Sequence, residues 1–209
     1  MRSSFSLVVS TILIIAKCNA EVCTNDAGDE RACFQTSHTF THPIESNETT
    51  FPDDGEIKEY HFHTYWFQHR PESYAAALRI QSELLNAVTE GKFIVVLPGI
   101  TEEILPGIDE SQIPHINTEP VGPHPCGSFE TWVPQEYLSE AMSFFMQRRG
   151  ELSILFHPRT RWEVEDHGAR NMWIGPPMRL DYTVLALDLE EPPAQYPELN
   201  LGYSAFKAS

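Results

Sequence analysis

The chain has 209 residues, of which 41% are hydrophobic and 21% are charged. That length suits one globular domain, since a domain typically spans about 100 to 200 residues, and the composition excludes disorder throughout. With 30 Asp and Glu against 14 Lys and Arg, the formal net charge is −16, which excludes a strongly basic nucleic-acid-binding protein. Anionic membrane surfaces are disfavoured for the same reason.

The first twenty residues are predicted to be a secretory signal peptide. Arg2 gives the positive start, an apolar run extends from Phe5 to Ala16, and the small residue Ala20 suits signal peptidase. A membrane anchor is the alternative, but the run is shorter than the roughly 20 residues that a bilayer core requires. We therefore expect a mature chain that begins at Glu21 and is secreted to the extracellular space, with no membrane attachment after cleavage.

A polar N-terminal extension is expected over residues 21–55. Cys23 and Cys33 lie close together in it, and the oxidising secretory compartment favours a disulfide between them. Asn47 begins an Asn-Glu-Thr sequon for glycosylation. We expect Cys126 to be a buried thiol bonded to neither of the other two, with a reactive thiol or an intermolecular disulfide as alternatives.

The pattern that follows begins with a strand and a helix. Aromatic residues and partial alternation over residues 60–67 predict a strand. Pro71 is expected to open an amphipathic helix that Gly91 ends. A short β-rich run over residues 93–97 predicts the second strand, for which residues 115–121 are the alternative.

The second half of the domain repeats this order. Residues 127–133 predict a third strand, and Pro134 is expected to open a second amphipathic helix that Gly150 closes. Residues 152–157 predict a fourth strand. β-prone residues at 182–187 are expected to add an edge strand.

The order strand, helix, strand, strand, helix, strand is the pattern of ferredoxin-like α+β domains. It predicts a βαββαβ sandwich in which both helices cover one face of an antiparallel sheet. We expect this domain to span residues 56–189. A strapped-down C-terminal tail is expected over residues 190–209, because Glu-Glu-Pro-Pro ends the preceding run.

Histidines are predicted to gather on the sheet face that the helices leave open. Side chains alternate along a strand, so His61 and His63 share one face, and the same rule directs Glu130 and His157 to it. The first, third and fourth strands are neighbours in a ferredoxin-like sheet, which lets these side chains converge. Imidazole and carboxylate suit a divalent first-row metal, and three such ligands leave positions open for substrate and oxygen, as non-haem iron requires.

The other histidines are interpreted differently. His124 lies between two prolines, where a preorganised metal ligand and an ordinary loop residue both fit. We expect no metal role for His38, His42, His69 and His115, because His readily satisfies both ring nitrogens by hydrogen bonding.

Four motifs occur together in the chain. They are Tyr-His-Phe-His-Thr-Tyr-Trp-Phe at 60–67, Gly-Pro-His-Pro-Cys-Gly-Ser-Phe-Glu-Thr-Trp at 122–132, Leu-Phe-His-Pro-Arg-Thr at 155–160, and Asp-His with a following Trp-Ile-Gly at 166–175. In order and relative spacing they resemble the motifs of the DOPA 4,5-dioxygenase family of fungi and bacteria. The resemblance covers roughly residues 57–187. It implies a ferredoxin-like fold and extradiol cleavage of a catechol ring by Fe(II) with dioxygen as co-substrate.

The residues and the resemblance together give expected roles. The metal ligands are expected to be His63, His124 and His157. Glu130 is the substitute carboxylate, and His61 or His167 is expected to act as the acid/base, because the pKa of an imidazole lies near working pH.

A substrate with a carboxylate, such as DOPA, needs a cation that can bind it through two hydrogen bonds. Arg159 and Arg170 are the expected residues, and Arg161 and Arg179 are the alternatives. The expected partner is thus a small catechol, and both a monomer and a homodimer are compatible with the sequence.

The sequence is compatible with three functions. The first is a secreted iron-dependent extradiol dioxygenase. The second is a secreted metal- or catechol-binding module of the same fold that turns nothing over. The third is a ferredoxin-like oxygenase that works without a cofactor. Oxygen uptake and its dependence on metal distinguish the three.

Overall fold

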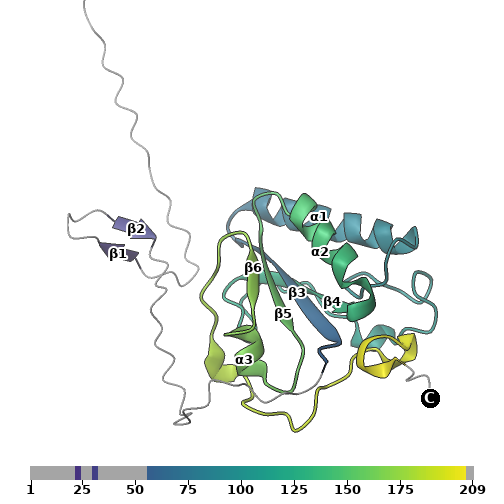
Figure 1. The fold of residues 1–209 in the computed structure, drawn as a ribbon. Helices are drawn as coiled ribbons and strands as arrows, with labels where there is room; N and C mark the ends of the chain where they lie inside the picture. The colour runs from purple at the N-terminus through teal and green to yellow at the C-terminus, as the bar shows by residue number, and fades with distance from the viewer. Residues whose placement is uncertain (1–21, 25–29, 33–55, 206–209) are drawn as a thin grey trace, which may run out of the picture.

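The computed structural model describes residues 22–24, 30–32 and 56–205 (Figure 1). The expected signal peptide, the sequon at Asn47 and the residues Cys33, His38 and His42 lie outside these ranges, and so does the expected Cys23–Cys33 disulfide. Two short strands, β1 (Val22–Thr24) and β2 (Glu30–Ala32), pair antiparallel with each other. Among the described residues, none of the helices combines the length and hydrophobicity of a membrane-crossing segment.

The main body alternates strands and helices along the chain. Its strands and α-helices are β3 (Glu59–Trp66), α1 (Pro71–Thr89), β4 (Gly127–Pro134), α2 (Leu138–Arg148), β5 (Ser153–Pro158), α3 (Glu163–His167) and β6 (Met172–Ile174). Single 3₁₀ turns are η1 (Glu110–Gln112), η2 (Gln135–Tyr137), η3 (Tyr182–Val184), η4 (Pro197–Leu199) and η5 (Gly202–Ser204).

The sheet has the strand order β4-β3-β5-β6, and every neighbouring pair is antiparallel. β3 pairs along its whole length with β4 and with β5 over residues 60–65. The predicted first, third and fourth strands are therefore neighbours, and α1 and α2 lie together on one face of the sheet (Figure 1). The predicted α+β ferredoxin-like fold is confirmed.

The predicted second strand is the main departure in this sheet. Residues 93–97 contribute one bridge, Val96↔Trp132, at the free edge of β4. Pro98 and Gly99 turn the chain directly afterwards, Gly99 with φ +94°, so no length remains for a ladder. The alternative over residues 115–121 also gives an isolated bridge, Asn117↔Ser128, and not a strand.

Two further element predictions are wrong. Residues 182–187 form no edge strand, because the Asp181 side chain accepts a hydrogen bond from the Thr183 backbone N–H and starts a 3₁₀ turn; β6 takes the edge position. Pro134 does not open α2. It is the last residue of β4, with extended ψ of 155°, and η2 separates it from the helix.

The helix-covered face of the sheet holds the main core. Phe62 of β3 and Ile154 of β5 are fully buried beneath Ile80, Leu84 and Phe145 of the two helices. The Phe62 and Phe145 rings stack with centroids 4.7 Å apart. Burying each such side chain contributes about 1.5–3 kcal/mol, so this layer fixes β3 and β5 in place and with them the residues on the opposite face.

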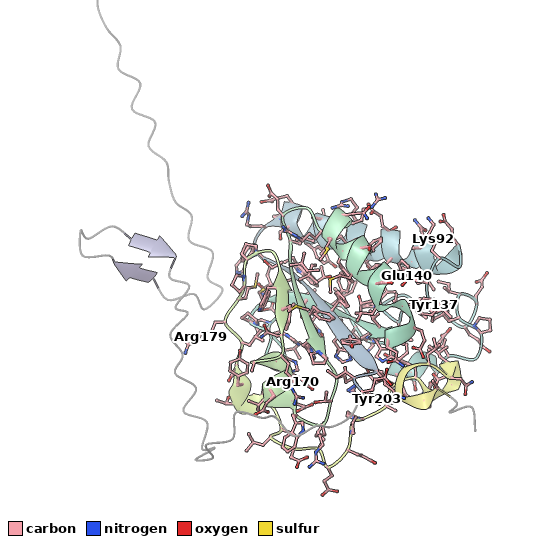
Figure 2. All side chains as sticks on the ribbon, viewed as in Figure 1. Lys92, Tyr137, Glu140, Arg170, Arg179 and Tyr203 are labelled. Carbon is pink, nitrogen blue, oxygen red and sulfur yellow. The ribbon has the colours of Figure 1, made fainter. Side chains whose placement is uncertain are left out.

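A C-terminal segment, residues 190–205, which we call the strap, passes the end of the sheet at which β3 begins (yellow in Figure 1). Glu59, fully buried at the start of β3, accepts hydrogen bonds from the strap's Gln195 N–H and Tyr203 N–H, both at 3.1 Å. It also accepts one from Trp132 Nε1 at 2.9 Å. The strap is thus tied to the sheet by a buried carboxylate, and Tyr203 lies beside the sheet in Figure 2.

Candidate metal centre and active site

Five histidines from four parts of the chain meet on the open face of the sheet. His61 and His63 come from β3, His157 from β5, His124 from the loop before β4, and His167 from the end of α3. All five are buried. They line a cavity of about 190 Å³, whose wall also contains parts of the loop over residues 185–193.

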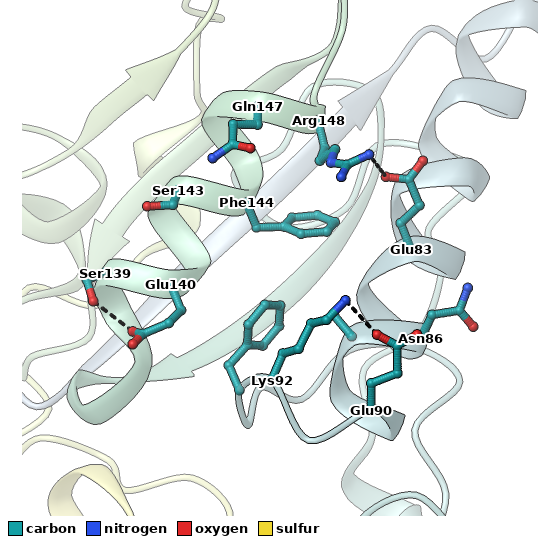
Figure 3. A pocket seen from close by; sticks show the side chains of 12 residues that line it. Glu83, Asn86, Glu90, Lys92, Ser139, Glu140, Ser143, Phe144, Gln147 and Arg148 are labelled. Atoms are coloured by element: carbon teal, nitrogen blue, oxygen red, sulfur yellow. Dashed lines mark hydrogen bonds and ion pairs between the residues drawn. The ribbon is translucent and has the colours of Figure 1, made fainter.

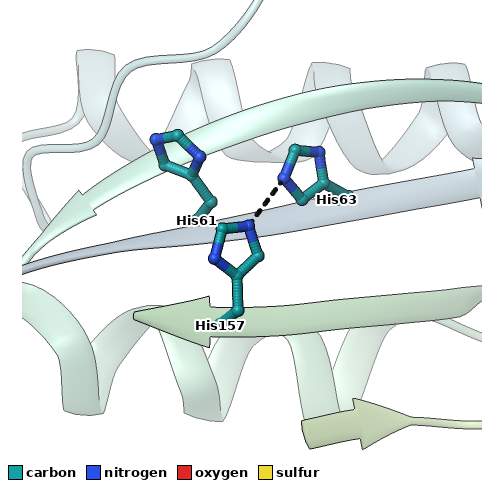
Figure 4. Close-up of side chains that lie close together, drawn as sticks. All are labelled: His61, His63 and His157. Carbon is teal, nitrogen blue, oxygen red and sulfur yellow. Dashed lines mark hydrogen bonds between the residues drawn. The ribbon is translucent and has the colours of Figure 1, made fainter. Parts of the chain in front are cut away.

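Strand alternation explains the first three of these side chains. His61 and His63 are two positions apart in β3, and His157 pairs directly with His61 in the neighbouring strand. The Nε2 atoms of His63 and His157 lie 3.1 Å apart (Figure 4). One ring nitrogen of each of the three residues lies within 4.8 Å of the others, so the three can share one ion.

A second group overlaps the first at His63. One nitrogen from each of His63, His124 and His167 also lies within 4.8 Å of the others. The rings of His63 and His124 have centroids 4.1 Å apart, and those of His157 and His167 lie 3.9 Å apart. The predicted ligands His63, His124 and His157 do not all belong to either group. His63 shares the first group with His157 and the second group with His124.

Backbone carbonyls fix which nitrogen two of the rings present to the cavity. His157 Nδ1 lies 2.7 Å from the Pro158 carbonyl, and His167 Nδ1 lies 2.9 Å from the Glu163 carbonyl. A carbonyl only accepts, so each Nδ1 carries the hydrogen and each Nε2 keeps its lone pair. Such a bond from the second ring nitrogen is typical of metal-binding histidines.

The donor set fits a divalent first-row metal ion. Two imidazole nitrogens that bind one ion at about 2.0–2.1 Å in neighbouring positions lie about 3.0–3.4 Å apart, which matches His63 and His157. Burial also lowers the pKa of both imidazoles well below the ordinary value, and the neighbouring histidines lower it further. The rings are therefore neutral at neutral pH, which is the form that binds metal.

Glu130 faces the remaining histidine, His61. Its Oε2 lies 3.3 Å from His61 Nδ1, while His61 Nε2 lies 2.7 Å from Gln195 Oε1 of the strap. Burial raises the pKa of Glu130 to about 7, against the opposing effects of the Arg159 charge and of a hydrogen bond from the Gln195 side chain. A carboxyl group with a pKa of about 7 is suited to exchange a proton near neutral pH.

The two predicted substrate-binding arginines take different positions. Arg159 lines the cavity, and its pKa is lowered by burial while Glu130 and Glu59 act in the opposite direction. Arg170 is not among the residues that line the cavity; its guanidinium donates to Thr160 Oγ1 at 2.9 Å and to Asp166 Oδ1 at 3.2 Å. Figure 2 shows Arg170 near α3 and Arg179 at the edge of the body. Arg161 pairs with Asp188 on the loop.

Three residues of the site were not assigned a role from the sequence. Tyr65 shares the face of His61 and His63 by alternation, and its hydroxyl lies 2.7 Å from His124 Nδ1. Asp166 accepts hydrogen bonds from the Thr160 backbone and side chain. These bonds hold α3, and with it His167, in place. Alternation signals Tyr65 and the Asp-His motif signals Asp166, but no local pattern points to Gln195.

A larger cavity of about 610 Å³ lies on the other side of the molecule, between α1 and α2 (Figure 3). Its wall carries ion pairs, among them Lys92 with Glu90 and Arg148 with Glu83. None of the histidines lines it. Size alone therefore does not mark the functional site, and the smaller cavity holds the groups with metal-binding and proton-transfer chemistry.

Comparison with known proteins agrees with this location. Residues 60–184 match the model of the Dopa 4,5-dioxygenase family. A DOPA 4,5-dioxygenase from Amanita muscaria is 38% identical over 174 residues, which cover 80% of this chain and 70% of that protein. An uncharacterised 21.2 kDa protein from Botryotinia fuckeliana is 33% identical over 76 residues, which cover 32% of this chain and 41% of that one.

Among solved structures, one described as a dioxygenase from Nostoc punctiforme is 25% identical and covers 59% of this chain and 87% of that one, with a TM-score of 0.45. The matched family segment contains all five buried histidines and Glu130. Together with the length and identity of the match to the Amanita muscaria enzyme, this segment establishes the relationship. The chain belongs to the Dopa 4,5-dioxygenase family.

Proposed function

We propose that the protein is a secreted, iron-dependent extradiol dioxygenase that opens the ring of a catechol, with DOPA as the first substrate to test. The observation that carries the proposal is the group of five buried imidazoles around one cavity in a member of a dioxygenase family. The relative from Amanita muscaria is named for activity on DOPA. The overall reaction breaks the carbon–carbon bond beside the diol and adds both atoms of dioxygen, which gives one carboxylic acid and one aldehyde.

The proposed ligands are His63, His124 and His157, which take one partner of His63 from each of the two groups, although neither group contains all three. His63 and His157 present facing Nε2 atoms, and the His124 ring lies against that of His63. His124 would bind through Nε2 and donate its Nδ1–H to the Tyr65 hydroxyl oxygen at 2.7 Å. When bound, Fe(II) supplies a site where catechol and dioxygen come together and lowers the pKa of the phenol.

His61 is better suited to proton transfer than to metal binding, because both of its nitrogens already have partners. Nε2 meets Gln195, and Nδ1 meets Glu130. In this proposal the phenol proton passes to the His61–Glu130 pair, in which Glu130 has the pKa near the operating pH while burial lowers the pKa of His61 well below its ordinary value. His167, with its lone pair on Nε2 and its ring beside His157, is the second acid/base.

Arg159 is the proposed anchor for a substrate carboxylate. It lies in the cavity wall, and its Nε makes no hydrogen bond within the described part of the chain, although Glu59 lies 3.9 Å away. A carboxylate would satisfy this buried donor through the planar guanidinium. The cavity, at about 190 Å³, suits one aromatic ring, since a cavity of about 150 Å³ holds benzene.

The test is oxygen uptake by purified protein that has been loaded with Fe(II) in the absence of air. We expect one dioxygen to be consumed per DOPA, a ring-opened semialdehyde as product, and no uptake by metal-free or zinc-loaded protein. A His63→Gln variant prepared in the same way is the control. Binding of catechol without uptake would instead indicate a non-catalytic binding module, and equal uptake without metal would indicate a cofactor-free oxygenase.

A further inference from the structure

The strap carries a side chain into the active site from far along the chain. Gln195 contacts His61, which lies 134 positions earlier. We propose that Gln195 is a positioning residue, which fixes the tautomer and orientation of His61 against Glu130 and so makes the C-terminal strap part of the active site. This inference rests on the proposed function, in which His61 moves a proton.

The hydrogen bonds of the Gln195 amide carry the first step. Its Oε1 lies 2.7 Å from His61 Nε2, and an amide oxygen only accepts, so Nε2 carries the hydrogen. The lone pair of His61 is then on Nδ1, which faces Glu130 Oε2 at 3.3 Å. The same Gln195 side chain also acts to lower the pKa of Glu130. The amide thus orients His61 toward Glu130.

The backbone at Gln195 is held firmly enough for this role. The Gln195 N–H donates to Glu59 Oε2 at 3.1 Å, and Glu59 is fully buried. The next residue, Tyr196, is 1% exposed, and its hydroxyl donates to the Gln112 carbonyl at 3.2 Å. Tyr196 has φ +47°, a left-handed conformation that a non-glycine residue keeps only where its surroundings impose it.

The strap lies beyond the segment that defines the family. The family match ends at residue 184, whereas the contacts to His61 and Glu59 begin at residue 195. The proton-transfer pair therefore depends on a residue that the family motifs do not include. Without it His61 has no acceptor for its Nε2–H, and the ring is free to take the other tautomer, in which Nδ1 no longer presents a lone pair to Glu130.

The test compares Gln195→Met with wild-type protein and with Glu198→Gln. Methionine keeps the length of the side chain but removes the amide. Glu198 belongs to the same strap, and its Oε1 accepts from the Asp109 N–H at 3.0 Å, away from the cavity. For Gln195→Met we expect kcat to fall on the order of 10-fold to 100-fold, with unchanged KM, iron content and urea midpoint. Glu198→Gln should keep the wild-type kcat.

A second readout does not depend on activity. In metal-free protein labelled with ¹⁵N-histidine, the ring shifts of wild-type His61 should report the Nε2–H tautomer alone. Gln195→Met should give a mixture of tautomers. Gln195→Glu, which keeps an acceptor for Nε2–H, should restore the wild-type spectrum.

Each failure has a distinct meaning. Wild-type kcat in Gln195→Met, or an unchanged His61 spectrum, would overturn the positioning role while leaving the dioxygenase proposal intact. Loss of iron or of stability in that variant would also overturn it, because the effect would then be structural. Absence of oxygen uptake by the wild-type protein would reject the proposed function, and the ¹⁵N spectra would still decide how Gln195 acts on His61.

Discussion

The Nε2 atoms of His63 and His157 face each other at 3.1 Å, although the two residues are 94 positions apart in the chain. Since the His157 Nδ1–H is bound to the Pro158 carbonyl, the His157 lone pair is on Nε2. Two neighbouring strands thus hold a pair of donors at the separation that one metal ion requires.

Removing either donor should therefore weaken metal binding. We expect His63→Gln and His157→Gln to bind Fe(II) 10-fold to 100-fold more weakly or worse, on the order of what loss of a supporting residue alone costs. Equilibrium dialysis followed by metal analysis measures this. His69→Gln, at an exposed position beside α1, is the control and should keep full iron content. Full iron content in both site variants would contradict the assignment.

The raised pKa of Glu130 gives a pH-dependent contribution to stability. In the folded protein this pKa is raised to about 7 from an ordinary value of 4.5, so the folded state holds a proton that the unfolded state has lost. Stability from this group is therefore present at low pH and is lost as pH rises through 7.

Glu130→Gln isolates this contribution. Between pH 6 and pH 8, the stability of metal-free wild type relative to the variant should fall by about 1 kcal/mol, less than the full linkage value, since 24% of the side chain is exposed. Urea unfolding of both proteins at both pH values measures it. A difference that stays constant, or rises with pH, would show that Glu130 is ionised in the folded protein.

Gly202 should not tolerate a side chain. A Cβ there would lie 2.6 Å from Glu59 Cγ, and the backbone has φ +59°. We expect Gly202→Ala to lose about 1–3 kcal/mol more stability in urea unfolding than Gly122→Ala. Gly122 has a similar φ of +54° but nothing within 4 Å of its Cβ position, so it carries the backbone strain without the clash. Equal losses of stability in both variants would mean that the strap moves to accommodate the Cβ without destabilising the protein.

The first residue of the mature protein tests whether the chain is secreted. Protein recovered from the medium of a eukaryotic expression host should begin at Glu21, because Ala20 suits signal peptidase and polar residues follow it. Asn47→Gln should lower its mass by one glycan. Material that retains Arg2 would reject both the signal peptide and the proposed localisation.

The cysteines give a separate prediction for the same secreted material. Cys23 and Cys33 should be recovered as one disulfide-linked peptide pair without reduction, since they are close in sequence and the compartment is oxidising. Cys126 should be recovered as a thiol: it is fully buried, with its Sγ 3.6 Å from Met178 Sδ. Alkylation before and after unfolding, followed by peptide mapping, distinguishes the two. A mixed pair with Cys126 would contradict the prediction.

The parts of the fold set by strand periodicity could be predicted from the sequence. Alternation placed His61, His63, Glu130 and His157 on one face, and the order of elements placed their strands side by side. The prediction of a second strand at 93–97 was wrong. The run is buried and β-rich, but Pro98 and Gly99 turn the chain before a ladder forms. Hydrophobicity indicates burial, but pairing depends on where the chain goes next.

The contacts between distant segments could not be predicted in the same way. Gln195 lies in a segment without any period, and its partner His61 is 134 residues away, so no local pattern links them. The same holds for ring tautomers, which depend on whether a carbonyl such as that of Pro158 lies beside a given nitrogen. Nor does the sequence alone show that Arg159 lines the cavity and Arg170 does not, because no local pattern distinguishes the two positions.

The hydrogen bond between Glu59 and Tyr203 joins residues 144 positions apart. The carboxylate at the start of β3 therefore depends on a donor that lies close to the end of the described chain. A carboxylate at a buried position is costly while its donors are missing. During synthesis Glu59 must therefore stay hydrated until residues 195–203 have left the ribosome, and the open face of the sheet closes after the rest has packed. A chain cut short before residue 195 is expected to be an unfinished protein that is prone to degradation, and not a smaller active one.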